Sequence, residues 1–232
     1  MKDAKATVYE DLKHRILTLQ LLPDEMLDEA TLSERYAISR TPIREIFRRL
    51  EGEGYVDIRE NRGARVAPMD FARLRHFFQA APIVYAAIGR LAVHNFTSRQ
   101  LDELKATQTR FRRAMAERDA TAMVLENNRF HAVMGEMAGN PYLQASLDRL
   151  LIDHARIGCT VYRPMNDAME HHLELSVSEH DLLIEAIERR DEEAVAALVL
   201  QHWQPARENL QMYIAPSGVK ADPFEVVAAA GA

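Results

Sequence analysis

The chain has 232 residues, 47% of them hydrophobic, and a formal net charge of −6 at pH 7. This length suits two modest domains or one large one, and the apolar content is ordinary for a protein that buries a core. The negative charge argues against a protein that coats nucleic acid indiscriminately, but it allows a local basic surface. The single cysteine, Cys159, excludes an internal disulfide and fits a reducing cytosol. We find no signal peptide and no apolar run that could span a bilayer, so we expect a cytoplasmic protein without a membrane partner.

The N-terminal part of the chain begins with patterns typical of three helices. Apolar residues recur at helical spacing from Val8 onward, until Pro23 breaks the pattern. Thr31 is predicted to cap a short helix, with Glu34 three residues later as the second half of a capping box. Pro42 suits the first turn of the next helix, because its missing N–H would have no partner there anyway. That helix has an apolar face made of Ile43, Ile46, Phe47 and Leu50.

The next stretch, "YVDIRENRGARVAPM", predicts a hairpin. Residues 55–58 favour one strand, "ENRG" a turn and "ARVA" a returning strand. Pro68 and the polar residues that follow indicate a domain boundary. A short helix, a tight turn, a second helix and a hairpin make a winged helix-turn-helix. We therefore expect residues 1–68 to form a DNA-binding domain.

Four arginines crowd into residues 40–49 of this acidic chain. In a winged helix-turn-helix the second helix enters the major groove. Arg40 at its start and Arg44 one turn later are expected to reach base edges, since arginine pairs with guanine through two hydrogen bonds. Ser39 and Thr41 are expected to donate to a phosphate at the helix N-terminus, where the helix dipole also favours an anion. The alternative interpretation is an ordinary solvated face whose arginines pair with neighbouring glutamates.

The hairpin completes the predicted DNA interface. Arg62 and Gly63 fall at its tip, where a glycine lets the backbone come close to the sugar–phosphate chain. Arg48 adds a weaker candidate one turn beyond Arg44. The predicted DNA-binding residues are therefore Ser39, Arg40, Thr41, Arg44, Arg48, Arg62 and Gly63.

The rest of the chain predicts an all-helical domain over residues 71–214. Breaks such as "AGNP" and "YRPMND" separate the helices, because the residue before a proline avoids the helical conformation. Residues 215–232 are rich in small residues, Pro and Gly, and are predicted to be a flexible tail. The fold class is mainly α, a winged helix-turn-helix followed by a helical bundle. The predicted helices are about 71–94, 98–117, 119–138, 141–160, 168–190 and 191–214.

Histidine spacing in the helical part suggests a metal site. Asn127 and His131 stand four residues apart, on one face of one predicted helix, while His180 lies on a later predicted helix and His202 on the helix after that. Three imidazoles and a side-chain oxygen would suit a divalent transition metal. Spacing alone leaves open that these histidines are ordinary core or surface residues. We interpret His154, His171 and His172 as surface residues, and His14, His76 and His94 have no constellation around them.

The stretch "LSERYAISRTPIREIFRRLEGEGYVDIRENRGARV" resembles the DNA-binding domain of the GntR family of bacterial transcription regulators. The resemblance covers nearly all of the N-terminal domain. It implies a homodimer on a palindromic operator, base contacts from Arg40 and Arg44, and Gly63 at the tip of the wing. The chain departs from the family at Ala30, where relatives often carry a basic residue.

Residues 71–214 resemble the all-helical FCD effector domain of the FadR-like branch of this family, through "RFHAVMGEMAGNPYL" and "EHDLLIEAIERRDEEAVAALVLQHW". Six helices suggest its VanR-like subgroup. In many such domains an aspartate and three histidines hold a metal, and a carboxylate-bearing metabolite binds beside it. Carried over by position, the ligands are Asn127, His131, His180 and His202, with asparagine in place of the aspartate. The implied metal is zinc first, then nickel or manganese.

The effector pocket also departs from the resemblance. Many relatives have an arginine about one turn before a glutamate in the first helix of this domain, and this chain has Ala81 and Tyr85 there. Tyr85 would offer the pocket a hydroxyl or an aromatic wall.

Three functions follow from these patterns. The first is a transcription regulator, a repressor, whose helical domain binds a small metabolite such as an organic acid next to a metal. The second is the same regulator with a metal-free pocket. The third and most remote is a metal-dependent hydrolytic enzyme, for which the sequence offers no clear general base.

Overall fold

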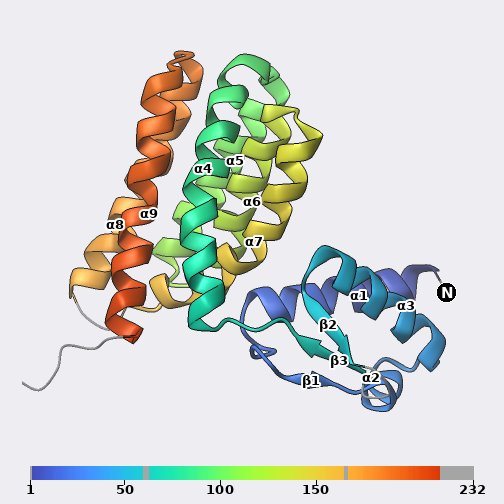
Figure 1. The fold of residues 1–232 in the computed structure, drawn as a ribbon. Coiled ribbons are helices and arrows are strands. Elements are labelled where there is room, and N and C mark those ends of the chain that lie inside the picture. The colour runs from blue at the N-terminus through green and yellow to red at the C-terminus, as the bar shows by residue number, and fades with distance from the viewer. Residues whose placement is uncertain (1, 60–62, 165–166, 215–232) are drawn as a thin grey trace, which may run out of the picture.

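The computed structural model describes residues 2–59, 63–164 and 167–214. Within them the predicted class is confirmed, with a small helical and stranded head followed by a helical bundle (Figure 1). Arg62 and the tail predicted at 215–232 lie outside the described residues. No helix in the described ranges is both long and apolar enough to cross a membrane.

The head, residues 2–66, is a winged helix-turn-helix. Its helices are α1 (Lys2–Leu17), α2 (Glu29–Tyr36) and α3 (Arg40–Glu53). Its antiparallel sheet has the order β1 (Met26–Leu27), β3 (Gly63–Val66), β2 (Val56–Arg59). In the hairpin Val56 pairs with Val66 and Arg59 with Gly63. The side chains that hold these elements together are almost completely buried: Leu12, Ile16, Ile43, Phe47 and Leu50.

The start of α2 corrects one sequence-based prediction. The N-cap is Asp28 instead of Thr31, and α2 begins at Glu29. The Asp28 carboxylate accepts hydrogen bonds from the backbone N–H of Thr31 at 2.8 Å and from its hydroxyl at 3.0 Å. Thr31 is therefore the residue whose backbone N–H is capped, three positions after the N-cap.

The bundle comprises the six helices from α4 to α9. Four of them begin at a residue whose side chain caps the helix, namely Asp70, Thr97, Asp119 and Asn140. Such caps satisfy backbone N–H groups that have no partner inside the helix, and they are local signals that can be found in sequence. The six helices are α4 (Phe71–Asn95), α5 (Ser98–Ala116), α6 (Ala120–Ala138), α7 (Pro141–Val161), α8 (Asp167–Glu188) and α9 (Glu192–Ile214).

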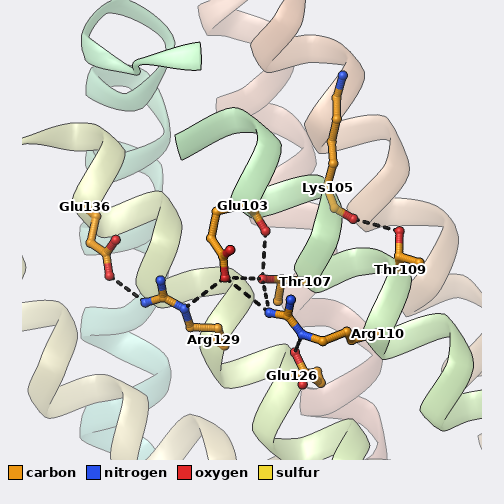
Figure 2. Close-up of polar contacts among 8 residues, drawn as sticks. All are labelled: Glu103, Lys105, Thr107, Thr109, Arg110, Glu126, Arg129 and Glu136. Atoms are coloured by element: carbon orange, nitrogen blue, oxygen red, sulfur yellow. Dashed lines mark hydrogen bonds and ion pairs between the residues drawn. The ribbon is translucent and has the colours of Figure 1, made fainter. Parts of the chain in front are cut away.

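Packing in the bundle centres on α4 and α6. Helix α4 contacts α6, α7 and α9, and it continues through Pro82 without ending. On the outside, two ion pairs link α5 to α6, Arg110 with Glu126 and Arg129 with Glu103 (Figure 2). Each arginine also pairs with a glutamate of its own helix, Arg110 with Glu103 and Arg129 with Glu136. Pairs at this exposure contribute about 0–1 kcal/mol each, so the buried apolar contacts hold the bundle together.

The head meets the bundle along α7. The side chain of Arg156 is fully buried, and it donates to the carbonyl of Ala67 at 2.9 Å and to Asp153 at 3.3 Å. Arg73, at the start of α4, donates to the same Asp153 at 2.7 Å. Apolar residues from α1 and α7 share one core cluster. The segment between β3 and α4 therefore passes over a buried network of charged groups.

Candidate metal centre and nucleic-acid interface

The predicted DNA-reading residues on α3 form an exposed face. The side chains of Ser39, Arg40, Thr41, Arg44 and Arg48 are all exposed. Ser39 is the N-cap of α3, yet its hydroxyl makes no capping hydrogen bond. This hydroxyl and the first N–H groups of α3 therefore remain available to an anion such as a DNA phosphate.

Neighbouring glutamate side chains partly neutralise the positive charge of this face. The Arg44 guanidinium donates to Glu29 of α2 at 2.8 Å while its side chain stays 58% exposed. An exposed pair of this kind is weak, so a nucleic acid can displace Glu29. Arg49 is engaged differently, because it pairs with Glu53 and lies 3.6 Å from the ring centre of Tyr9. The alternative interpretation, an ordinary solvated face whose arginines pair with glutamates, therefore fits Arg49 better than Arg40.

The structure gives a different reason for a glycine at position 63 of the wing from the one predicted. Its φ is +81°, a conformation that favours glycine, and an added Cβ would collide with the carbonyl oxygen of Leu27 in β1. Gly63 is therefore required by close approach within the sheet of the head itself. Its contact with a sugar–phosphate chain stays a prediction.

Four histidines converge inside the bundle. They are His131 on α6, His154 on α7, His180 on α8 and His202 on α9, and each is at most 7% exposed. The ring centre of His131 lies 4.6 Å from that of His154, 5.3 Å from His202 and 5.5 Å from His180. Nitrogens of His131, His154 and His202 lie within 4.8 Å of one another. We call these four residues and Asn127 the histidine cluster.

The position of His154 contradicts the prediction of a surface residue. It follows Leu147 and Leu151 at spacings of four and three, so it continues the buried stripe of α7. That stripe was the signal that could have identified it. Among the predicted ligands, His131 and His202 belong to the close group, while His180 lies beside it, stacked on Phe130 at 3.9 Å. His171, by contrast, is exposed as expected.

Hydrogen bonds fix which nitrogen carries the proton in three of the rings. The Gln108 amide donates to the carbonyl of Val177 and to Asp181, so its oxygen is the atom that accepts from Nδ1 of His180 at 3.0 Å. The Glu179 carboxylate likewise accepts from Nδ1 of His202 at 2.8 Å. In both rings Nε2 is then the nitrogen that this hydrogen bond leaves free. Sequence reasoning missed Gln108 and passed over Glu179, because their roles depend on contacts with distant histidines.

Tyr85 anchors the third ring. Its hydroxyl lies 2.7 Å from Nδ1 of His154, and Nδ2 of Asn127 lies 3.2 Å from Nε2 of the same ring. Because an amide N–H can only donate, His154 Nε2 is an acceptor here and Nδ1 donates to Tyr85. Burial raises the pKa of Tyr85 well above its usual value, so the hydroxyl keeps its proton. Tyr85 also contacts the rings of His131 and Trp203.

Several buried polar atoms of the histidine cluster have no hydrogen-bond partner. They are both ring nitrogens of His131, Nε2 of His180 and Oδ1 of Asn127. Burial, with a smaller effect from neighbouring histidines, lowers the pKa of His154 to about 3 and places those of His131 and His180 well below the usual value. The rings of His131, His154 and His180 are therefore neutral at pH 7, which is the form that binds metals.

This donor set fits a divalent transition metal. Neutral imidazole nitrogens held by outer hydrogen bonds, together with an amide oxygen, are ligands that zinc, nickel and copper accept. Buried polar atoms normally find partners, and the orphaned nitrogens of His131 and His180 would gain one from a bound ion. The buried Glu179 carboxylate also calls for positive charge nearby.

An exposed recognition helix on a winged head, joined to a helical bundle with a buried histidine cluster, defines a DNA-binding regulator with an appended helical domain. The family model for bacterial regulatory proteins of the GntR family matches residues 4–66, and the model for the FCD domain matches residues 83–205. The chain belongs to the GntR family of transcription regulators, in the branch that carries an FCD domain. The family consists of regulators and not enzymes, which removes the hydrolase hypothesis.

Individual relatives agree with this assignment. The chain is 24% identical to the HTH-type transcriptional repressor RspR of Escherichia coli, over 88% of this chain and 87% of RspR. It is 28% identical to the repressor GlaR of the same organism, over 84% of this chain and 90% of GlaR. The solved structure of E. coli McbR/YncC has the same fold, with a TM-score of 0.75 at 20% identity, covering 91% of this chain and 97% of that one. A GntR regulator from Rhodococcus sp. RHA1 gives a TM-score of 0.70 at 17% identity, covering 91% of this chain and 98% of that one.

Proposed function

We propose that this protein is a cytoplasmic, homodimeric repressor that binds palindromic operator DNA and is controlled by a small metabolite bound beside a metal ion in the bundle. The observation that carries the proposal is the histidine cluster, with the orphaned nitrogens and neutral rings of His131 and His180. Two relatives named as repressors support repression as the direction of control. A homodimer follows from the geometry of such sites, because one winged head reads only one half-site.

The operator interface is assigned to the exposed face of α3 and to the wing. Arg40 and Arg44 would read base edges, while Ser39 and Thr41 would hold a phosphate at the start of the helix. Support comes from the exposure of all four side chains and from the unused hydroxyl of Ser39. Arg48, Arg62 and Gly63 complete the proposed set.

The metal is assigned to Asn127, His131, His180 and His202, with His154 added because its nitrogen lies in the close group. Zinc is the first choice, with nickel and manganese as the alternatives. When bound, the ion supplies an electrophilic position to which a donor atom of the effector can coordinate. Gln108, Glu179 and Tyr85 each bond Nδ1 of one ring, so Nε2 of His180, His202 and His154 would be the nitrogens that bind the ion. Tyr85 would also form a wall of the effector pocket.

One observation favours the second candidate, the same regulator with a metal-free pocket. Nδ2 of Asn127 already lies 3.2 Å from Nε2 of His154, so these two groups satisfy each other without an ion. An asparagine also brings no negative charge to attract one. In that case the effector would bind the polar cavity directly.

The experiment compares operator binding in defined metal states. An operator would be selected from random DNA with the wild-type protein, and its affinity measured by fluorescence anisotropy across a salt series. We expect steeply salt-dependent binding to one palindromic sequence, with metal-loaded and chelated protein responding differently to a panel of small organic acids. Absence of any sequence preference at physiological salt would contradict the regulator. An identical response in both metal states would favour the metal-free pocket.

A further inference from the structure

We propose that Asn127 makes the histidine cluster an uncharged ligand set, which selects zinc-like ions over manganese and makes metal binding depend on a small monoanion. This inference rests on the metal site of the proposed function and adds which ions and which class of partner ligand the site accepts. It follows from where the carboxylates of the bundle lie.

Carboxylates are absent from the set of atoms that would hold the ion. Among the described residues, the buried acidic side chains are those of Asp153 and Glu179. Asp153 binds Arg73 and Arg156 at the junction with the head. Glu179 accepts a hydrogen bond from Nδ1 of His202, on the side of that ring opposite the nitrogen that faces the cluster. The atoms left for an ion are imidazole nitrogens and Oδ1 of Asn127, none of which carries a negative charge.

This composition decides between metals. Imidazole suits zinc, nickel and copper, whereas manganese and magnesium prefer carboxylate, carbonyl and water oxygens. An aspartate at position 127 would supply one charged oxygen, but Asn127 offers an amide oxygen, which brings no negative charge to the ion. His154, whose ring centre lies 4.6 Å from that of His131, adds a further nitrogen. The site is therefore nitrogen-rich, and manganese is the ion that it disfavours.

The same composition leaves a charge to be balanced. A divalent ion brings two positive charges into a buried site, and Glu179 compensates one of them. Burying the remaining charge without a partner is costly, so a monoanion that coordinates the ion should bind together with it. Asn127 can assist, because its amide also carries N–H donors, which an aspartate lacks. Metal and anion should then strengthen each other's binding by the same factor.

The test compares the wild-type full-length chain with Asn127→Asp and with Asn128→Asp as the matched control. Asn128 is the next residue on α6 and lines a different cavity, a cleft of about 880 Å³ between the head and the bundle, together with Tyr9 and Arg149. It therefore receives the same chemical change outside the histidine cluster. Affinities for Zn²⁺ and Mn²⁺ would be measured at buffered free-metal concentrations, in perchlorate and in acetate at equal ionic strength.

Binding can be followed inside the site. Trp203 is the only tryptophan of the chain, and its ring centre lies 4.6 Å from that of His154. Its fluorescence therefore reports ions and anions at the histidine cluster, independently of DNA binding.

In the wild type and in Asn128→Asp, we expect acetate to raise Zn²⁺ affinity by roughly 5- to 150-fold, the usual range of coupling between sites. In Asn127→Asp the acetate effect should largely disappear, and Mn²⁺ affinity should rise by about tenfold or more through the added charge. Equal acetate effects in the wild type and Asn127→Asp, or unchanged Mn²⁺ affinity, would overturn the inference alone. A wild type that binds no Zn²⁺ in either salt would overturn the metal site of the proposed function as well.

Discussion

The head and the bundle place their functional polar groups in opposite environments. On the head, Arg40 and Arg44 stand in water, where a charge costs little and a partner can be exchanged. In the bundle, His131 and His180 are almost wholly buried, and burial keeps their rings neutral. The head is therefore ready to meet a polyanion, whereas the bundle requires a partner small enough to be enclosed.

The two regions meet on one helix. Helix α7 carries His154 toward the histidine cluster, and Asp153 and Arg156 toward the segment that leads to the head. The thiol of Cys159 on the same helix contacts the carbonyl of Leu17 in α1. Helix α7 therefore links the histidine cluster to the head through neighbouring residues and their hydrogen bonds.

The largest effect is expected inside the bundle, from Phe130→Ala. Phe130 is fully buried and stacks on His180, so its truncation should lower the free energy of unfolding by about 3–5 kcal/mol. Urea unfolding measures this loss, and Zn²⁺ affinity should fall with it. Tyr142→Ala, at an 85% exposed position of α7, is the control and should change stability by about 0.5 kcal/mol at most. Equal losses in the two variants would mean that Phe130 does not support the cluster.

The next effect is expected at the junction of the two regions. Arg156→Ala leaves Asp153 with one partner fewer and the Ala67 carbonyl without its donor, which should cost about 3–5 kcal/mol. Arg156→Met fills the same space and should cost less. Protease cleavage between the head and the bundle would show whether the junction has loosened. Wild-type stability in Arg156→Ala would contradict the role given to this network.

Substitutions on the head should weaken operator binding without lowering the stability of the fold. Arg40→Ala and Arg44→Ala should each weaken operator binding by about 1–3 kcal/mol, with little change in unfolding. Arg113→Ala, an exposed arginine on α5, serves as the control for general loss of charge. If all three variants weaken DNA binding equally, the recognition face has been assigned to the wrong surface.

The smallest effects contrast two N-caps. Asn140 accepts hydrogen bonds from two backbone N–H groups at the start of α7, so Asn140→Ala should cost about 1 kcal/mol of stability and leave operator affinity unchanged. Ser39 makes no such bond, so Ser39→Ala should weaken operator binding and hardly change stability. Thermal unfolding and anisotropy on both variants would check this. A stability loss for Ser39→Ala as large as for Asn140→Ala would contradict the proposed phosphate contact.

Local signals explain how much could be predicted. The predicted starts of the bundle helices lie close to the observed ones because residues such as Thr97 and Asn140 cap the helices that follow them. The two-residue strand Met26–Leu27 was missed because it exists only through its pairing with β3. Thr31 was mistaken for the cap because Asp28 offers the same capping chemistry three residues earlier. The domain boundaries at 68 and 71 stay predictions.

The histidine cluster shows where sequence reasoning ends. Asn127 and His131 could be paired because they share one helix, but the approach of His154, His180 and His202 depends on how four helices pack. Gln108 was invisible for the same reason, since nothing near it in sequence indicates a histidine partner. The resemblance to a family supplied four candidate ligands by position and did not include His154, which the structure places in the close group.

The measurement that tests the account most directly is the metal content of the chain purified without chelator or metal-affinity resin. It would be compared with a His131→Ala, His180→Ala double variant. The account predicts about one ion per chain in the wild type and none in the double variant. A wild type that remains metal-free after incubation with zinc would contradict it, and the effector would then have to bind the polar cavity alone.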